Sequence, residues 1–345
     1  MTLPTSMRAV EADAFSIDAL KLVERPVPVA RRGEILVRVH CASLNYRDLA
    51  ILAQGYLPTL PLPYVPASDA AGVVVAVGDD VTRFRVGDRV MPVYTQGWYD
   101  GKPTPEMRTK RTLGAPLSGV LQEYLAIPAE DAVPTPANLT DREAATLPIA
   151  ALTAWSTLQE GGVKPGDTVL VQGTGGVAIF ALQFAKLAGV KVIVTSSSDD
   201  KLARAQTLGA DVAINYRKTP AWDVAVKEAT GGRGVDIVVE TAGASLDKSL
   251  ACTAFGGFVG VIGFVAGREA TIPIRSLIGP MIRVQGIAVG SRARFEAMNR
   301  AIGQHRLKPV IDAVYPLDEA AEAFRQMDRG AQFGKLVIDV AGAAS

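Results

Sequence analysis

The sequence predicts an α/β protein in two parts, a small β domain and a doubly wound parallel sheet. Short β-like runs separated by turns fill the first third, and strands alternate with helices from about residue 140 onward. The chain of 345 residues also exceeds the usual size of one domain. Hydrophobic residues make up 48% and charged residues 21%, a globular composition that excludes a disordered chain.

The β-like runs of the first third have the features of half-buried strands. Residues 36–40 alternate apolar and polar side chains, and residues 71–77 and 89–93 are also strand-like. Turn residues separate these runs, which indicates a small barrel or sandwich. Residues 95–119 are rich in Gly, Pro, Lys and Arg and have no apolar period, so we expect one long loop, either a flap or a surface excursion.

A change of pattern marks the second part of the chain. Thr140 and Glu143 have the spacing of a helix capping box. We then expect strands at 168–172, 191–195, 212–215, 235–240, 258–264 and 282–289, and helices at 177–187, 199–208, 221–230 and 245–254. This alternation indicates a parallel, doubly wound sheet. Helices at 292–303 and 318–329 and a strand at 335–339 complete the prediction.

A glycine-rich turn follows the first of these strands directly. Gly173, Gly175 and Ala178 have the spacing of the dinucleotide-binding fingerprint, with alanine in its third position. Gly173 allows the tight turn, Gly175 lets a pyrophosphate approach the backbone, and the next helix N-terminus attracts its charge. A plain strand-to-helix turn is the alternative, but the surrounding strands and helices favour a nucleotide site.

The end of the second strand indicates which dinucleotide binds. NAD sites usually carry an acidic residue there for the ribose, whereas this chain has Ser196 and Ser197, followed by Lys201. Hydroxyls and a positive charge suit a 2′-phosphate, so we expect NADPH to be preferred over NADH. Asp199 and Asp200 count against this, because they could turn inward, and the serines could instead cap the next helix.

The charge and the cysteine content of the chain exclude several kinds of binding partner and metal site. A net charge of +1 leaves no electrostatic footprint for nucleic acid or anionic membranes. Cys41 and Cys252 are too few for a disulfide framework or a four-cysteine zinc site. The N-terminus has no apolar leader, and we interpret the uncharged residues 249–267, with five glycines, as containing a buried strand. We therefore expect a cytoplasmic protein without nucleic-acid or membrane partners.

Short motifs spread over nearly the whole chain carry a family resemblance. They lie at 44–48, 66–72, 87–90, 152–155, 173–177 and 333–337. The chain resembles the medium-chain dehydrogenase/reductases, in their zinc-independent, quinone-oxidoreductase-like branch. The resemblance implies a GroES-like substrate domain (1–132 and 293–345) and a Rossmann NADP-binding domain (133–292). It also implies an active site in the cleft between them and a homodimer formed through the sixth strand of the parallel sheet.

The resemblance also implies that no metal is bound. Zinc members of the family carry Cys at the position of Asn45 and His-Glu at the positions of Ser68 and Asp69. Neither Asn45 nor Ser68 is a good zinc ligand. Residues 95–119, where zinc relatives often bind a structural zinc, contain no cysteine.

Chemistry without a metal favours an activated acceptor. Reducing a quinone or enone requires only stabilisation of charge on oxygen and a proton. Asn45 is our candidate for orienting the acceptor or the nicotinamide ribose, or else it is a turn residue before a helix. Asp48 is expected to be structural. Tyr56 has the spacing of a tyrosine in related enoyl and quinone reductases, where it would donate a proton or line the pocket.

The remaining candidates would bind the cofactor. By resemblance, Thr153 contacts the nicotinamide, Tyr216 and Lys201 contact the adenosine phosphate, and Lys335 lies near the nicotinamide or is a surface lysine. The ends of the fourth and fifth strands add further contacts. The expected set is Thr153, Gly173, Thr174, Gly175, Gly176, Val177, Ser196, Ser197, Lys201, Tyr216, Thr241, Gly243, Gly263, Phe264, Val265 and Lys335.

These candidates predict a zinc-independent, NADPH-dependent oxidoreductase that transfers hydride to a quinone, an enone or a similar activated carbonyl. An enoyl-thioester reductase, or another alcohol dehydrogenase-like member, is the first alternative, and Arg108, Lys110 and Arg111 could then bind a carrier. The second alternative is a crystallin-like protein that binds NADPH with little turnover.

Overall fold

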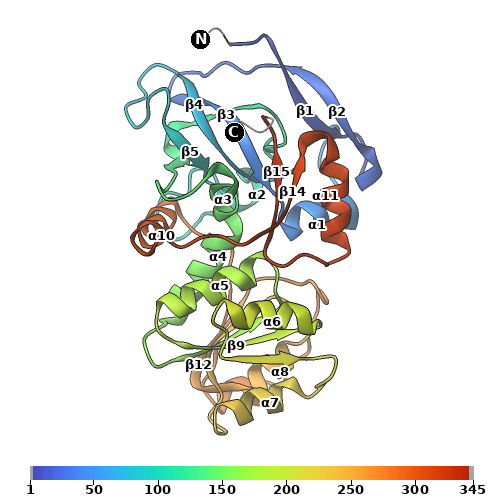
Figure 1. The fold of residues 1–345 in the computed structure, drawn as a ribbon, viewed down its shortest axis with the longest axis vertical. Coiled ribbons are helices and arrows are strands. Elements are labelled where there is room, and N and C mark those ends of the chain that lie inside the picture. Colours follow the sequence, from blue (N-terminus) through green and yellow to red (C-terminus); the bar gives the residue numbers. More distant parts are fainter. Residues whose placement is uncertain (1–2, 342–345) are drawn as a thin grey trace. The chain divides into compact units, whose positions relative to one another are not determined.

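The computed structural model describes residues 3–341 and divides into two compact units (Figure 1). The first contains Met1–Leu152 and Gly290–Ser345, and the second contains Thr153–Val289. Our expected boundary placed residues 133–152 and 290–292 in the second domain, whereas they pack within the first unit. The reason is that β7 (Ala132–Pro134) pairs with β5 (Arg89–Pro92), and α3 (Asp141–Ala144) packs on strands of the same sheet.

The second unit is built on six parallel strands in the order β10-β9-β8-β11-β12-β13. The strands are β8 (Thr168–Gln172), β9 (Lys191–Ser196), β10 (Val212–Asn215), β11 (Val235–Glu240), β12 (Thr253–Val261) and β13 (Arg283–Gly286). In chain order this is 3-2-1-4-5-6, the doubly wound order whose direction reverses between β8 and β11. The predicted six-stranded Rossmann sheet is therefore confirmed.

Helices connect these strands much as the sequence predicts. They are α5 (Gly176–Leu187), α6 (Asp199–Thr207), α7 (Trp222–Ala229) and α8 (Leu246–Ala251). The helices α5 and α6 pack on β9, while α7 and α8 pack on each other. All five residues of β8 are buried, because helices cover both faces of a parallel sheet, and such strands are apolar throughout.

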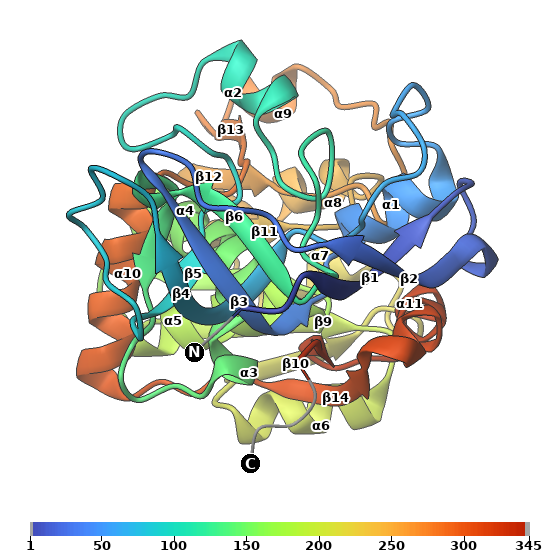
Figure 2. The same cartoon turned by 90° about the horizontal axis from the view of Figure 1, so that it is seen from above.

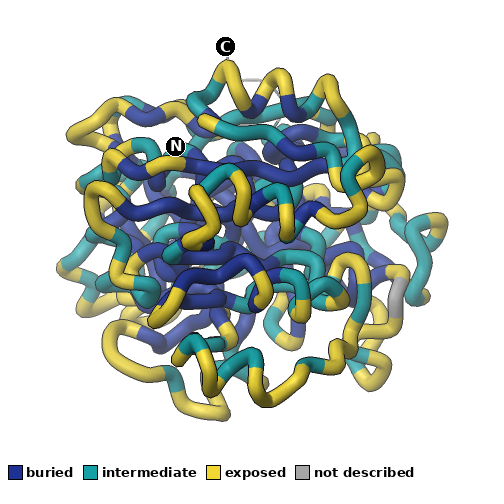
Figure 3. Tube along the Cα trace, turned by 90° about the horizontal axis from the view of Figure 1, so that it is seen from below, coloured by how far each residue is buried: buried dark blue, intermediate teal, exposed yellow. Residues whose placement is uncertain are grey.

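The first unit contains a seven-stranded sheet with the path β14-β15-β3-β4-β5-β7, and β6 pairs with β3 (Figure 2). Its strands include β3 (Glu34–Ser43), β4 (Asp69–Val77), β6 (Tyr124–Pro128), β14 (Ile311–Pro316) and β15 (Lys335–Asp339). A separate hairpin is formed by β1 (Ser6–Ala12) and β2 (Leu20–Pro26). Figure 3 shows buried stretches of the chain joined by exposed bends. The expected GroES-like β domain is confirmed.

Several elements of this unit differ from the sequence prediction. The segment 95–119 is not one unbroken loop, because Thr104 caps a short helix, α2 (Pro105–Lys110), with proline in its first turn. A helix after Asn45 was expected only as an alternative and without bounds, and the structure gives it as α1 (Tyr46–Gln54). The sequence assigned neither α4 (Leu152–Gly161) nor the strands β1, β2, β6, β7 and β14. The helices α10 (Arg292–His305) and α11 (Ala320–Asp328) match the expected ones within two residues.

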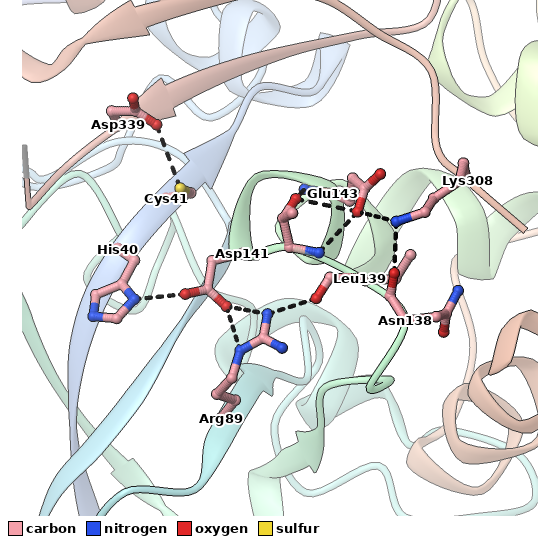
Figure 4. A network of polar contacts seen from close by, with 10 residues as sticks. His40, Cys41, Arg89, Asn138, Leu139, Asp141, Glu143, Lys308 and Asp339 are labelled. Carbon is pink, nitrogen blue, oxygen red and sulfur yellow. Dashed lines mark hydrogen bonds and ion pairs between the residues drawn. The ribbon is translucent and has the colours of Figure 1, made fainter. Parts of the chain in front are cut away.

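A polar network fixes α3 to the sheet of the first unit (Figure 4). Asp141 Oδ1 accepts hydrogen bonds from Arg89 Nε at 2.9 Å and Nη2 at 2.5 Å, and its Oδ2 lies 2.6 Å from His40 Nδ1. The predicted capping box is present, since Thr140 N donates to Glu143 Oε2 at 2.8 Å. Lys308 Nζ binds the same carboxylate at 2.9 Å. Residues 138–143 are thereby tied to strands β3 and β5.

No helix within residues 3–341 is both long enough and apolar enough to cross a membrane.

The Asp141 network predicts a pH-dependent loss of stability. Burial opposes ionisation of Asp141, but hydrogen bonds from His40 and Arg89 lower its pKa below the ordinary value. A lowered pKa stabilises the fold above the unfolded-state pKa of about 3.9, and this stabilisation is lost as the pH falls through the folded-state pKa. We expect Asp141→Asn to cost about 2 kcal/mol of unfolding free energy near neutral pH, and progressively less below about pH 4.

Denaturant unfolding at a series of pH values would measure this difference. Asp80→Asn is the matched control, because Asp80 pairs with Arg32 at an exposed position, where such a pair contributes little. A cost for Asp141→Asn that stays constant into strong acid would contradict the assigned ionisation.

Candidate functional site

The glycine turn of the second unit has the geometry that a phosphate requires. Gly173 has φ +79° and its N–H donates to Thr195 O at 2.7 Å, which holds the turn against β9. Gly175 is the N-cap residue of the twelve-residue helix α5, and a Cβ built at Gly175 would meet nothing within 4 Å. Open space above the backbone, next to the unpaired N–H groups of a helix N-terminus, suits a pyrophosphate.

The end of β9 presents the residues expected around a 2′-phosphate. Ser196 is buried, Ser197 is half-buried, and Tyr216 N donates to Ser196 O at 3.1 Å. The capping alternative applies to Ser198, whose Oγ accepts from Lys201 N at 3.4 Å. Ser198, rather than Ser196 or Ser197, is therefore the N-cap of α6.

Asp199, the acidic residue that argued against a preference for NADPH, forms hydrogen bonds with two other side chains. Its carboxylate accepts from Asn215 Nδ2 at 2.7 Å and from Lys218 Nζ at 2.5 Å. These hydrogen bonds lower the pKa of Asp199. The acid is therefore held by β10 and the residues that follow it.

The turns after β11 and β12 are packed against each other. A Cβ at Gly243, which has φ +80°, would lie 2.4 Å from Gly267 O and 3.0 Å from Phe264 Cα. A Cβ at Gly263 would lie 2.8 Å from Thr241 O. The structure thus brings Thr241, Gly243, Gly263 and Phe264 together at the carboxyl ends of parallel strands, where ligands bind in such sheets. Val265, next to them, is exposed, and Thr153 is buried in α4.

Three adjacent strands place a second set of candidates together in the first unit. The strands β15 and β4 both run antiparallel to β3, with Val337 opposite Ser43 and Ser43 opposite Asp69. The start of β15, the end of β3 and the start of β4 therefore share one edge. Lys335, Asn45 and Asp69 meet there.

Lys335 is at the centre of this cluster and is 3% exposed, so its surface-lysine alternative is wrong. Its Nζ donates to Leu44 O at 2.5 Å and to Asn45 Oδ1 at 2.7 Å. Asp69 is fully buried, and its Oδ2 accepts from Ile149 N at 3.1 Å. Asp69 Oδ1 and Asn45 Nδ2 have no hydrogen-bond partner. The Asn45 side chain nevertheless lies close enough to lower the pKa of Asp69.

Burial governs the electrostatics of the cluster. Burial raises the pKa of Asp69 to about 7, while Lys335 and Asn45 oppose the rise. Burial lowers the pKa of Lys335 against the attraction of Asp69 and Asp48. Burial also raises the pKa of Asp48, and the Arg47 guanidinium opposes this.

Asp48 has the structural role expected of it. Its Oδ2 accepts from Asn45 N at 2.9 Å, and its Oδ1 lies 2.9 Å from Ser68 Oγ. Ser68 Oγ also lies 2.9 Å from Leu113 O. Asn45 is thus the residue before α1, as its alternative assignment proposed, and its side chain also contacts Lys335. Within residues 3–341, no group of three or more His, Cys, Asp or Glu side chains could hold a metal ion.

Tyr56 lies apart from this cluster. It follows Gly55, the left-handed C-cap of α1, and is 44% exposed. Asn45 precedes the same nine-residue helix, so about 14 Å of helix separates the two residues. Asn45 and Tyr56 therefore lie at opposite ends of α1.

Sequence reasoning missed three buried polar residues, Asp69, Gln172 and Glu240. Each lies at the end of a strand, next to a motif already identified. A charged or amide residue in an otherwise apolar strand was the available signal, because such groups are buried only with partners.

Comparison with known proteins identifies the family to which the chain belongs. The family described as "Alcohol dehydrogenase GroES-like domain" matches residues 31–137, and "Zinc-binding dehydrogenase" matches residues 176–304. A zinc-type alcohol dehydrogenase-like protein of Schizosaccharomyces pombe is 44% identical, over 97% of this chain and 99% of that protein. The human quinone oxidoreductase is 30% identical, over 96% of this chain and 97% of its own.

The chain belongs to the medium-chain dehydrogenase/reductase superfamily. A solved structure of a putative alcohol dehydrogenase from Sinorhizobium meliloti agrees, with 46% identity, a TM-score of 0.93, and coverage of 98% of this chain and 100% of that one. An NAD-dependent alcohol dehydrogenase is 36% identical with a TM-score of 0.88, covering 97% and 100%. The chain is an oxidoreductase of the alcohol dehydrogenase and quinone oxidoreductase family.

The buried cluster predicts that Lys335 is essential to the stability of this medium-chain dehydrogenase/reductase. Lys335→Met leaves the Asp69 carboxyl buried without its cation and Leu44 O without its donor. We expect a cost of about 3–5 kcal/mol of unfolding free energy, measured by denaturant titration. In the double variant Lys335→Met/Asp69→Asn we expect part of this cost to be recovered, because the uncompensated charge is gone.

Lys308→Met is the control, since Lys308 is an exposed partner of Glu143 and should contribute at most about 1 kcal/mol. Equal costs for the Lys335 and Lys308 variants would refute the buried-cation assignment.

Proposed function

We propose that this protein transfers hydride from NADPH to a quinone, an enone or a similar activated carbonyl, without a metal. The proposal rests on the contacts of Asn45 and Ser68, because zinc members of the family have metal ligands at these two positions. Asn45 Oδ1 accepts a hydrogen bond from the Lys335 ammonium, and the Ser68 hydroxyl lies against Asp48 and Leu113 O. These residues do not fit a zinc ion, so the proposed reaction uses no Lewis acid at this position.

The second unit supplies the residues for the nicotinamide cofactor, which provides the hydride when bound. The glycine turn, with Gly173, Thr174, Gly175, Gly176 and Val177, would hold the pyrophosphate. Ser196, Ser197, Lys201 and Tyr216 would bind the 2′-phosphate, and the engagement of Asp199 with Lys218 and Asn215 supports this. The remaining contacts from this unit would come from Thr153, Thr241, Gly243, Gly263, Phe264 and Val265. Lys335 belongs to the first unit and is buried against Leu44 O and Asn45 Oδ1, so we assign it the role of holding Asn45 instead of a contact with the cofactor.

The reduction requires a proton for the oxygen on which negative charge develops. We assign this proton to Tyr56, an accessible phenol at the end of α1. We assign to the Asn45 amide, whose Oδ1 is held by Lys335 Nζ, the role of orienting the acceptor or the nicotinamide ribose. The quinone oxidoreductase among the relatives supports the acceptor class.

We also propose a homodimer formed through β13. This strand is the last of the six-stranded sheet, so one of its edges has no neighbouring strand within residues 3–341. Exposed apolar side chains lie before and beside it, namely Phe255, Ile274, Ile278 and Met281. An unpaired edge next to an apolar surface is a common site of self-association. A monomeric mass in light scattering would contradict the dimer.

The first experiment follows absorbance at the nicotinamide band with NADPH or NADH, in the presence of a chelator, with a quinone, an enone, an enoyl thioester or an aldehyde. We expect oxidation of NADPH by the quinone or enone. Preferred reduction of the thioester would favour the enoyl-thioester reductase instead. Tight binding of NADPH with no turnover of any acceptor would favour the crystallin-like alternative, and a chelator-sensitive reaction would refute the metal-free proposal.

Tyr56→Phe tests the proton donor. We expect kcat with an enone to fall at least tenfold while the Kd for NADPH changes less than twofold, because only the hydroxyl is lost. Tyr99→Phe is the matched control, since Tyr99 is 40% exposed against 44% for Tyr56. An unchanged kcat in the Tyr56 variant would make this residue part of the pocket wall.

Lys201→Ala tests the cofactor preference. Loss of a cation beside the 2′-phosphate should raise the KM for NADPH about tenfold or more and leave the KM for NADH nearly unchanged. Lys186→Ala is the control, because Lys186 binds Asp211 and Val190 O and has no assigned cofactor role. Equal effects of Lys201→Ala on both cofactors would refute the 2′-phosphate site.

A further inference from the structure

A buried polar network joins the carboxyl ends of β8 and β11. Gln172 Nε2 donates to Glu240 Oε2 at 2.7 Å and lies 2.7 Å from Ser249 Oγ. The Ser249 hydroxyl also donates to Glu240 Oε2. Glu240 Oε1 accepts from Ala242 N and Gly243 N, both at 2.9 Å. All three side chains are at least 96% buried.

The carboxylate of Glu240 is buried without a cation. In the described part of the chain, no Lys, Arg or His forms an ion pair with it. Burying an unpaired charge is costly, so its four hydrogen-bond donors must offset the lost hydration. An apolar residue would avoid this cost, as Ile237, Val238 and Val239 do in the same strand. The network therefore requires a function beyond filling the core.

The network connects two turns that belong to the proposed cofactor site. Gln172 directly precedes Gly173, and Glu240 directly precedes the turn formed by residues 241–243. The Gln172 side chain accepts from Thr241 N at 3.3 Å, while the Thr241 hydroxyl donates to the Gln172 carbonyl at 3.0 Å. The two turns flank the point between β8 and β11 at which the strand order reverses, and dinucleotides bind there in doubly wound sheets.

We propose that Gln172, Glu240 and Ser249 are positioning residues that set the spacing between the two turns and thereby the affinity for the dinucleotide. They act through the backbone of residues 173 and 241–243 and not by touching the 2′-phosphate. NADPH and NADH should therefore be affected by the same factor. The proposal rests on the proposed function only in requiring a dinucleotide in this unit, and not on the acceptor that is reduced.

The hydrogen-bonding pattern provides a reciprocal test. Glu240→Gln places an NH₂ group opposite the NH₂ of Gln172, and Gln172→Glu places two carboxylates opposite each other. The double variant Gln172→Glu/Glu240→Gln restores a donor facing an acceptor, with the charge on the other strand. Both backbone N–H groups of residues 242 and 243 still find an amide oxygen.

The experiment measures the Kd of the full-length protein for NADPH and for NADH by fluorescence titration, with the thermal midpoint recorded for each variant. We expect each single variant to weaken both cofactors at least tenfold and the double variant to return to within about threefold of the unaltered protein. Gln122→Glu is the matched control, since Gln122 is an equally buried glutamine in the first unit. It should lower the thermal midpoint and leave both Kd values unchanged.

Single variants that fold and keep the original Kd would overturn the proposal, as would a double variant that fails to recover. If a single variant does not fold, Ser249→Ala takes its place, because it removes one hydroxyl donor and should weaken both cofactors about threefold. An unchanged Kd in Ser249→Ala would then count against the proposal. Binding of cofactor without quinone or enone turnover would refute the proposed function and leave this test intact.

Discussion

Each unit depends on a buried charged side chain that is held by hydrogen bonds. In the first unit an ammonium, Lys335, is buried at one edge of the sheet and is held by Leu44 O and Asn45. In the second unit a carboxylate, Glu240, is buried at the ends of the central strands and is held by four donors. Unsatisfied groups at these depths would cost several kcal/mol each, so the surrounding turns have little freedom to move.

This constraint accounts for the arrangement of the side chains around positions 45 and 68. In zinc members of the family, a metal ion with its ligands occupies this region. Here the side chains of Asn45, Ser68, Asp48 and Lys335 form hydrogen bonds with one another and with the backbone. A charged network of this kind can orient an amide group, which agrees with the proposed reduction of an activated acceptor without a metal.

The two residues proposed to act on the acceptor lie at opposite ends of α1 in the first unit. Asn45, before the helix, belongs to a buried and rigid cluster, whereas Tyr56, after the helix, is accessible. An accessible phenol can exchange its proton with water between turnovers, while a buried amide can hold a fixed orientation. The difference follows from packing, because only the N-terminal end of α1 lies at the edge shared by β3, β4 and β15.

Much of the fold was determined by local features of the sequence. Apolar periodicity identified the six parallel strands, glycine spacing identified the turn at 173–178, and the absence of ligand types at 45 and 68 argued against zinc. Only the tertiary structure showed that Lys335 is buried against Asn45, 290 residues away, and that Gln172 meets Glu240, 68 residues away. Such contacts depend on which strands are neighbours in a sheet, and strand order is a property of the whole chain that no local pattern contains.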